Sequence, residues 1–236
     1  MFDTSRAADN GWVIWADRIR TGLGRPLPGR EAQLRFAPVP LLGPWDPADQ
    51  PPDARRAAAL MLIYPGAMGP TLLLTVRRPD LPHHGGQVSL PGGGLDAGES
   101  AETGALREAH EEVGLDPAAV EIAGSLSTLW VIVSRFVVQP VVAIAHTRPV
   151  FVPSPREVAS LIEVPLARLE DPVTVRWGRR HRFGRSIACP FFAVDGPPVW
   201  GATAMMLGEF CSALQPGFGP PPAPAPPEID QLPEIG

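Results

Sequence analysis

The chain has 236 residues, of which 44% are hydrophobic and 19% are charged, and its formal net charge is −5. The apolar fraction is sufficient for a sizeable core, and the negative charge argues against a protein that coats nucleic acid. All 20 basic residues are arginines, which excludes chemistry that needs a lysine amine, such as a Schiff base or a P-loop. Because neither a secretory signal nor an uninterrupted apolar span of about 20 residues is visible, we expect a cytoplasmic protein that binds no membrane and no nucleic acid.

Residues 1–56 are predicted to form an extension that precedes the main domain. A short helix is expected over Gly11–Thr21 with Asn10 as its cap, because three apolar side chains share one helical face: Trp12, Trp15 and Ile19. A proline-rich connector follows over 25–53. At the other end, residues 214–236 contain the run PPPAPAPP, which predicts a disordered or polyproline-like tail, with a ligand for a proline-recognising partner as the alternative.

The folded body is expected over 57–213. Two apolar runs, 59–64 and 71–77, flank a Pro-Gly turn and predict a hairpin of buried strands. Further along the chain the pattern predicts helices over 100–113, 156–169 and 202–214, and strands over 120–124, 127–133, 136–145 and 190–194. Pro140 predicts an edge or a bulge in its strand. Short connections between alternating elements favour an α/β fold with a mixed β-sheet and helices on both faces.

The helix over 100–113 carries two distinct faces. Four residues form an apolar stripe for the core: Ala105, Leu106, Ala109 and Val113. Glu108, Glu111 and Glu112 share another sector, where they repel one another and meet the negative end of the helix dipole. A bound cation would offset both costs, and clustered carboxylates suit Mg²⁺ or Mn²⁺. A solvated acidic face is the alternative.

The residues before this helix decide between those alternatives. A glycine-rich turn contains Gly93, Glu99 follows six residues later, and Arg107-Glu108 and Glu111-Glu112 precede a Gly-Leu pair. The whole segment, Gly93–Leu115, resembles the Nudix box, Gly-x5-Glu-x7-Arg-Glu-U-x-Glu-Glu-x-Gly-U with U aliphatic, at every fixed position. The resemblance implies the Nudix fold, an α/β/α sandwich, and hydrolysis of a nucleoside diphosphate linked to another moiety with Mg²⁺ or Mn²⁺ as cofactor.

The resemblance also implies roles for individual residues. Glu108 and Glu112 resemble the main metal ligands of the family, and Glu111 a further ligand or a partner of a metal-bound water. The Gly93 carbonyl resembles an additional metal ligand. Glu99 and Arg107 resemble a structural ion pair that fixes the loop against the helix. Nudix enzymes place the general base variably. Our candidate is Glu157, expected at the start of the helix over 156–169, with Glu111 as its rival; a carboxylate that merely stabilises that helix start is the alternative.

Segments outside the box resemble the coenzyme A pyrophosphatases of this superfamily. They are Leu74–Arg77, His84–Gly93, Gln139–Val142, Glu157–Val158, Val164–Leu166 and Val199–Ala204. Substrate contacts are therefore expected from Arg77, His84, Gln87 and Gly92, although loop packing is an alternative for His84. Three positions depart from the subgroup signature: Arg78 stands where Ser or Ala is usual, Pro82 where Arg is usual, and Leu90 where Phe is usual.

An arginine-rich turn over 176–185 is the only dense positive run in the predicted domain. Arg179 and Arg180 could hold substrate phosphates there, and a solvated hairpin is the alternative. Trp130 or Trp177 could stack on an adenine. His110 is expected to be structural, and Cys189 and Cys211 are expected to be buried thiols in a reducing compartment.

Two classes of function follow. The first is a metal-dependent enzyme that cleaves the pyrophosphate of coenzyme A or acyl-coenzyme A to 3′,5′-ADP and (acyl-)phosphopantetheine; ADP-ribose, NADH and dinucleoside polyphosphates are alternative substrates. The second is a regulatory module that binds nucleotides without turnover. Such a module would be expected to lose box glutamates, and here all are present. The expected partner is a small nucleotide, and a homodimer is left open.

Overall fold

The computed structural model describes residues 4–41, 45–182, 184–224, 229 and 231–235. The hairpin predicted from the two apolar runs is present, because β1 and β2 pair antiparallel with Ile63 opposite Leu72. The strands in chain order are β1 (Arg55–Gly66), β2 (Gly69–Arg77), β3 (Val88–Ser89), β4 (Gly92–Gly94), β5 (Val120–Ser125), β6 (Leu129–Val131), β7 (Phe136–Ala145), β8 (Val158–Pro165), β9 (Val175–Arg182), β10 (Arg185–Phe192) and β11 (Val199–Trp200).

Eight of these strands form one mixed sheet whose central path runs β3-β2-β1-β7-β5, with β4 beside β1, β6 beside β7 and β8 beside β2. The β1–β7 pair is parallel and the other pairs are antiparallel. A second sheet has the order β11-β10-β9. The helices are α1 (Thr4–Leu23), α2 (Gly29–Arg35), α3 (Ala101–Val113), α4 (Leu166–Leu169) and α5 (Gly201–Leu214), with 3₁₀ turns at Pro117–Ala119 and Pro172–Thr174.

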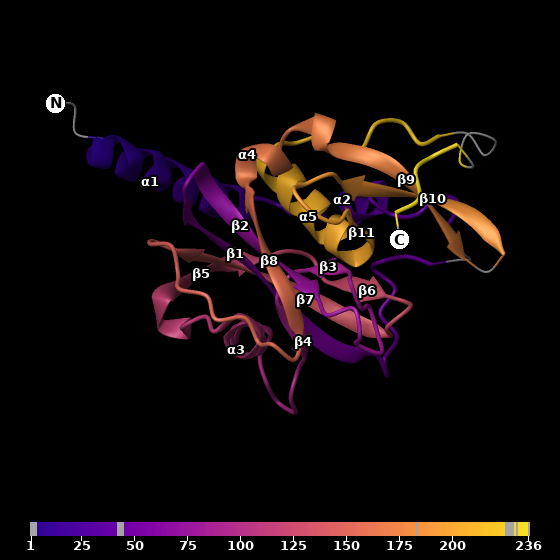
Figure 1. Ribbon diagram of the computed structural model, residues 1–236, viewed down its shortest axis with the longest axis horizontal. Helices are drawn as coiled ribbons and strands as arrows, with labels where there is room; N and C mark the ends of the chain where they lie inside the picture. Colours follow the sequence, from indigo (N-terminus) through magenta and orange to yellow (C-terminus); the bar gives the residue numbers. More distant parts are fainter. Residues whose placement is uncertain (1–3, 42–44, 183, 225–228, 230, 236) are drawn as a thin grey trace.

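The large sheet separates α3 from the other helices, as Figure 1 shows: α3 lies on one face, whereas α2, α5 and the small sheet lie on the opposite face. The predicted α/β fold with a mixed sheet flanked by helices is therefore confirmed. No helix in the described part of the chain is long and apolar enough to cross a membrane.

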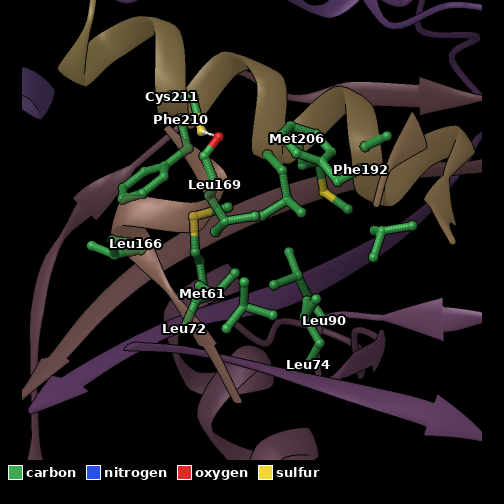
Figure 2. Packing of buried hydrophobic residues seen from close by; sticks show 14 of the residues in the cluster. Met61, Leu72, Leu74, Leu90, Leu166, Leu169, Phe192, Met206, Phe210 and Cys211 are labelled. Carbon is green, nitrogen blue, oxygen red and sulfur yellow. Dashed lines mark hydrogen bonds between the residues drawn. The ribbon is translucent and has the colours of Figure 1, made fainter. Parts of the chain in front are cut away.

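Each face of the large sheet has its own hydrophobic cluster, because successive side chains of a strand point to opposite faces. On β1, Leu60 and Leu62 pack toward α3, and Met61 and Ile63 belong to the cluster beneath α5. Figure 2 shows part of the second cluster, with Met61 below Leu169 and Phe210. Burying a side chain of this size contributes about 1.5–3 kcal/mol, so the two clusters fix both layers against the sheet.

The prediction of a helix over 156–169 is wrong. Residues 158–165 form β8, which pairs antiparallel with β2, and only Leu166–Leu169 are helical. Three β-branched residues in this segment are buried on the sheet, Val158, Ile162 and Val164, and such side chains favour a strand over a helix. Consequently Glu157 does not begin a helix, and the alternative role as a helix-start carboxylate is wrong as well.

Pro140 predicts an edge or a bulge, but its strand, β7, is central in the sheet. Pro140 lies opposite Ala59 on the β1 side. Its carbonyl accepts from Leu126 N at 3.0 Å on the other side, between the stretch of β7 paired with β5 and the stretch paired with β6. The nitrogen and the oxygen of one strand residue point to the same side, so the Pro140 nitrogen faces the gap between β5 and β6. A proline is tolerated there because the hydrogen-bonded ladder is already interrupted and no N–H donor is needed.

The N-terminal extension is more helical than predicted. The helix α1 begins at Thr4 and ends at Leu23, so Asn10 lies within the helix and does not cap it. The expected apolar face is present, because Ile19 is fully buried and Trp12 and Trp15 pack against the same cluster. The predicted connector contains a further helix, α2, whose buried Gln33 donates to Glu209 Oε2 of α5 at 2.8 Å.

The described part of the C-terminal tail lies against the small sheet, although the composition predicts disorder. Ile235 is buried; Arg179 N donates to Pro233 O at 2.7 Å, and Ile235 N donates to Arg179 O at 3.1 Å. The last three residues of the PPPAPAPP run lie outside the described residues. Both cysteines are free and buried, as expected, and burial raises the pKa of each thiol.

Candidate active site

The acidic helix α3 has defined ends and a buried face, and these fix the orientation of its glutamates. Ser100 caps the helix by accepting from Thr103 N at 3.1 Å, and Gly114 ends it in the left-handed conformation with φ 69°. Ala105 and Ala109 are fully buried against the sheet. The predicted start, end and core stripe of this helix are confirmed.

Glu112 is the buried member of the glutamate cluster. Its side chain is 3% exposed, and Arg77 Nη1 at the end of β2 lies 3.5 Å from its Oε1. Gly92 N donates to its Oε2 at 3.2 Å. Burial raises the pKa of Glu112 to about 7, against the lowering effects of the Gly92 hydrogen bond and the Arg77 charge. A buried carboxylate of this kind calls for a positive partner in its ionised form.

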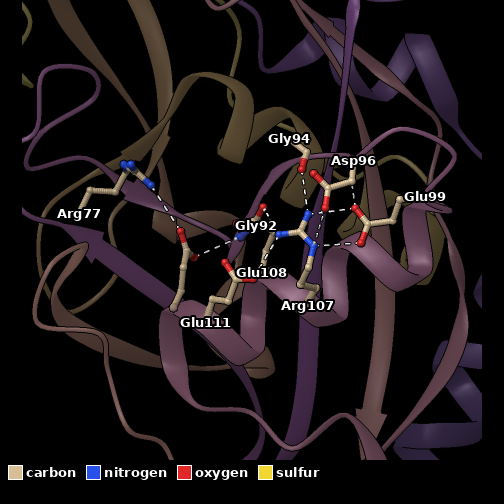
Figure 3. A network of polar contacts seen from close by, with 9 residues as sticks. Arg77, Gly92, Gly94, Asp96, Glu99, Arg107, Glu108 and Glu111 are labelled. Atoms are coloured by element: carbon tan, nitrogen blue, oxygen red, sulfur yellow. Dashed lines mark hydrogen bonds and ion pairs between the residues drawn. The ribbon is translucent and has the colours of Figure 1, made fainter.

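Arg107 occupies the centre of the polar network shown in Figure 3. Its Nε and Nη2 donate to the two oxygens of Glu99, both at 2.9 Å, and its Nη2 also donates to Gly94 O at 3.0 Å. Its Nη1 lies 2.8 Å from Glu108 and 3.4 Å from Glu111. The Glu99–Arg107 pair therefore joins the glycine-rich turn to α3, as the resemblance implies.

Two glycines of β4, Gly92 and Gly93, approach their neighbours too closely for a side chain. A Cβ added to Gly93 would lie 2.5 Å from the carboxyl group of Glu108, and one added to Gly92 would overlap the backbone of Ala58. Burial raises the pKa of Glu108 even though Arg107 lowers it. The Gly93 backbone and the Glu108 carboxylate are therefore adjacent groups with oxygen donors.

The donor set fits a divalent cation such as Mg²⁺ or Mn²⁺ in its chemistry: carboxylates and a backbone carbonyl are hard oxygen ligands. Gly93, whose carbonyl is the expected additional ligand, lies on the strand that approaches the Glu108 carboxylate closely. Among the described residues, no group of three or more His, Cys, Asp or Glu side chains is already arranged to hold a metal ion. Each of Glu108, Glu111 and Glu112 is instead paired with an arginine.

Glu157 lies in the turn that precedes β8, close to this cluster. Its charge contributes to the raised pKa of both Glu108 and Glu112, and its own side chain is exposed. The turn is attached to the end of α3, because Ser154 N donates to Glu112 O at 2.8 Å. The structure therefore attaches the turn that carries Glu157 to the end of the box helix α3, and Glu157 lies in a turn and not at the start of a helix.

Not every predicted substrate contact lies at the cluster. Arg77 and Gly92 contact Glu112 directly. His84 and Gln87 lie in the exposed loop before β3, where His84 Nδ1 and Gln87 Oε1 are 2.9 Å apart. Arg179 and Arg180 belong to β9, and Figure 1 places the β9–β10 hairpin and α3 on opposite faces of the large sheet. His110 has the expected structural role, with its Nδ1 2.9 Å from Leu115 O.

Two contacts were not predicted from the sequence. The guanidinium of Arg180 lies 3.8 Å above the ring of Trp200, and Arg78 Nη1 donates to Pro155 O in the turn before β8. The first contact joins two residues that are 20 positions apart in the sequence, and no local sequence pattern predicts such a pair. Arg78 was recognisable only as a departure from a signature, and that observation does not indicate what the side chain contacts.

The NUDIX domain profile matches residues 54–179. The chain belongs to the Nudix hydrolase family. Proteins named "Uncharacterized Nudix hydrolase NudL" support this: that of Enterobacter sp. (strain 638) is 39% identical over 173 residues, and that of Citrobacter koseri is 38% identical over 172, each match covering 70% of this chain and 85% of the relative. Among solved structures, RenU, a Nudix hydrolase from M. smegmatis, is 31% identical, with 50% of this chain and 74% of that chain covered and a TM-score of 0.44.

This Nudix hydrolase is therefore an enzyme, a pyrophosphohydrolase of a family that binds nucleotides and typically uses divalent metals. The residues of its box have distinct structural roles. Gly92 and Gly93 allow a close approach, Glu99 and Arg107 connect the turn to the helix, and the glutamates of α3 lie at the junction between the two. The fold thus concentrates oxygen donors where β4 lies beside α3.

Proposed function

We propose that this enzyme hydrolyses the pyrophosphate of coenzyme A or acyl-coenzyme A. A water oxygen forms a bond to one phosphorus, the bridging P–O bond breaks, and the products are 3′,5′-ADP and (acyl-)phosphopantetheine. The support lies outside the box, in the segments that resemble coenzyme A pyrophosphatases. Two of these segments meet in space: Thr203 Oγ1 donates to Val88 O at 3.1 Å. This contact is the observation that carries the substrate proposal, because it joins two segments of the subgroup signature that are far apart in the sequence.

A divalent metal belongs to this proposal, with Glu108, Glu112 and the Gly93 carbonyl as its ligands and Glu111 as a further ligand or a partner of bound water. Such an ion supplies neutralisation of the diphosphate and activation of a water molecule. Glu157 is our candidate for the general base that takes the proton of the attacking water, with Glu111 as its rival. The attachment of the turn that carries Glu157 to the end of α3, through Ser154 N and Glu112 O, supports this choice.

Arg180 is the candidate contact for the 3′-phosphate, together with Arg179. Trp200 belongs to the segment whose Thr203 contacts Val88, and the guanidinium of Arg180 stacks on the Trp200 ring. A guanidinium group suits phosphate recognition because its planar N–H donors match the geometry of phosphate oxygens. Because the small sheet and α3 lie on opposite faces of the large sheet, this proposal requires a substrate that extends from the box, past the end strand β3, to the small sheet. Pro82, where the subgroup usually has an arginine, is exposed in the loop before β3, and Arg180 would replace that lost contact.

Product analysis over a nucleotide panel with Mg²⁺ tests the proposal. Each charge-assisted hydrogen bond to a phosphate contributes roughly 1.5–3 kcal/mol, so dephospho-coenzyme A should be cleaved with kcat/KM about ten- to a hundredfold lower than coenzyme A. The double variant Arg179→Gln/Arg180→Gln should lose this preference, whereas Arg20→Gln, on α1, should retain it. Equal rates on both compounds would contradict the phosphate contact. Faster hydrolysis of ADP-ribose, NADH or a dinucleoside polyphosphate would contradict coenzyme A as the substrate.

A further inference from the structure

The turn that carries Glu157 is held on two sides. On one side it is attached to the end of α3, through Val152 N to Val113 O and Ser154 N to Glu112 O, both at 2.8 Å. On the other side it contacts the end of β2, where Arg78 N donates to Glu157 O at 2.9 Å. The position of Glu157 relative to Glu112 therefore depends on contacts from both elements.

The side chain of Arg78 adds a second link on the β2 side. Its Nη1 donates to Pro155 O at 3.1 Å, while its Nε and Nη2 form a paired contact with the two oxygens of Asp80 at 2.8 and 2.9 Å. The Asp80 contact fixes the plane of the guanidinium, because a fork of two parallel hydrogen bonds leaves little rotational freedom. The third nitrogen is then aimed at Pro155, two residues before Glu157.

We propose that Arg78 is a positioning residue for Glu157. This inference rests on the proposed role of Glu157 as the general base, and it assigns a function to a residue that departs from the subgroup signature. Ser or Ala at this position could not reach the Pro155 carbonyl and Asp80 at once. Lys could reach one of them, but it lacks the planar fork that binds both. Arg78 itself does not touch the reacting atoms.

A double-mutant cycle tests this proposal with the full-length enzyme. Arg78→Ala, Glu157→Gln and the combined variant are assayed for kcat and KM at saturating Mg²⁺ with coenzyme A, or with whichever nucleotide of the panel is cleaved fastest. Because small misplacements of catalytic groups are costly, Arg78→Ala should lower kcat about tenfold and change KM less than about twofold. In the Glu157→Gln background the same substitution should change kcat less than about twofold.

Three further variants separate positioning from general damage to the fold. Arg78→Lys should have a higher kcat than Arg78→Ala but a lower one than the parent enzyme. Asp80→Asn should also lower kcat, by a smaller factor than Arg78→Ala. Arg20→Ala removes an arginine that pairs with Asp17 and Glu121 on α1 and β5 and should leave kcat unchanged. All variants should keep the melting temperature of the parent within about 2 °C, since the Arg78 side chain is 41% exposed.

The outcomes discriminate between this inference and the proposed function. If Arg78→Ala lowers kcat by the same factor in the Glu157→Gln background as in the parent enzyme, or does not lower it at all, Arg78 does not act through Glu157. If Glu157→Gln leaves kcat unchanged, the assignment of the base fails and the positioning role fails with it. If Glu157→Gln lowers kcat while Arg78→Ala does not, only the role of Arg78 is overturned.

Discussion

Arg77 and Glu112 face each other where β2 ends beside the last turn of α3, with 3.5 Å between Arg77 Nη1 and Glu112 Oε1. The carboxylate is buried, and its other oxygen accepts from Gly92 N of β4. Glu112 therefore links three elements, β2, β4 and its own helix α3. A buried negative charge is costly without nearby positive charge; Arg77 supplies one such charge, and we propose that a metal ion bound by Glu112 would supply more.

The first prediction concerns Glu112 itself. Glu112→Gln should reduce turnover by on the order of 10²-fold or more, because it removes an anionic ligand of the proposed metal. The fold should be retained, since the substitution also removes a buried charge. Turnover and thermal unfolding are measured with the same protein. Glu102→Gln, an exposed position in the first turn of α3, is the matched control and should behave as the parent. Parent-like turnover of Glu112→Gln at saturating Mg²⁺ would contradict the metal assignment.

The second prediction compares two of the three glycines of β4, Gly93 and Gly94. Gly93→Ala should displace the carboxyl group of Glu108, because the added Cβ would lie 2.5 Å from it, whereas Gly94→Ala meets only Phe136 Cε1 at 3.7 Å. We therefore expect Gly93→Ala to raise the Mg²⁺ concentration needed for half-maximal activity at least about tenfold, and Gly94→Ala to leave it nearly unchanged. The obstructing group is the end of a flexible side chain, so both variants should remain folded. A normal Mg²⁺ requirement in Gly93→Ala would show that this approach does not matter for metal binding.

The third prediction concerns the pH dependence of stability. The hydrogen bonds from Arg107 lower the pKa of Glu99 to about 2, with a further contribution from Asp96 N. A carboxyl whose pKa is lower in the folded than in the unfolded protein stabilises the fold above the unfolded value and loses that effect as the pH falls. The difference in melting temperature between the parent and Glu99→Gln should therefore be full at neutral pH and shrink between about pH 4.5 and pH 2. A difference that does not depend on pH would exclude this ion pair as its source.

The site could be predicted from the sequence to the extent that it is local. The extent of α3, its end at Gly114 and its two faces were predicted from residues within a single short segment, and the structure has them. The burial of Glu112 could not be predicted, because it depends on Arg77 and Gly92 from other strands. Helical spacing placed three glutamates in one sector but gave no indication of which was enclosed.

The fold shows the same limit. The segment before Leu166 has apolar residues at positions 158, 162 and 166 that suit a helical face, and only pairing with β2 makes it a strand. Gln33 on α2 looks like an ordinary polar residue of a proline-rich connector, yet it is buried beneath α5 against Glu209. Both errors arose where a partner element determines the structure, and composition does not identify that partner.

The last prediction concerns the packing of the tail on the small sheet. Ile235 is buried in a cluster with Ile187, Cys189 and Phe191, and Gly178 of β9 has no room for a Cβ because the Ile235 side chain occupies that space. Ile235→Ala should lower the free energy of unfolding by about 2 kcal/mol, the lower end of the range for such truncations, since the site is near the chain end and can relax.

Gly178→Ala should also destabilise the enzyme, by displacing Ile235, whereas Gly11→Ala on α1 meets no atom within 4 Å and should stabilise the helix slightly. In the combined variant Gly178→Ala/Ile235→Ala the new methyl group enters the space that the isoleucine leaves. The loss should therefore be clearly smaller than the sum of the two single losses, measured by denaturant unfolding. Additive losses would mean that Ile235 and Gly178 are not in contact in solution, and that the tail leaves the small sheet.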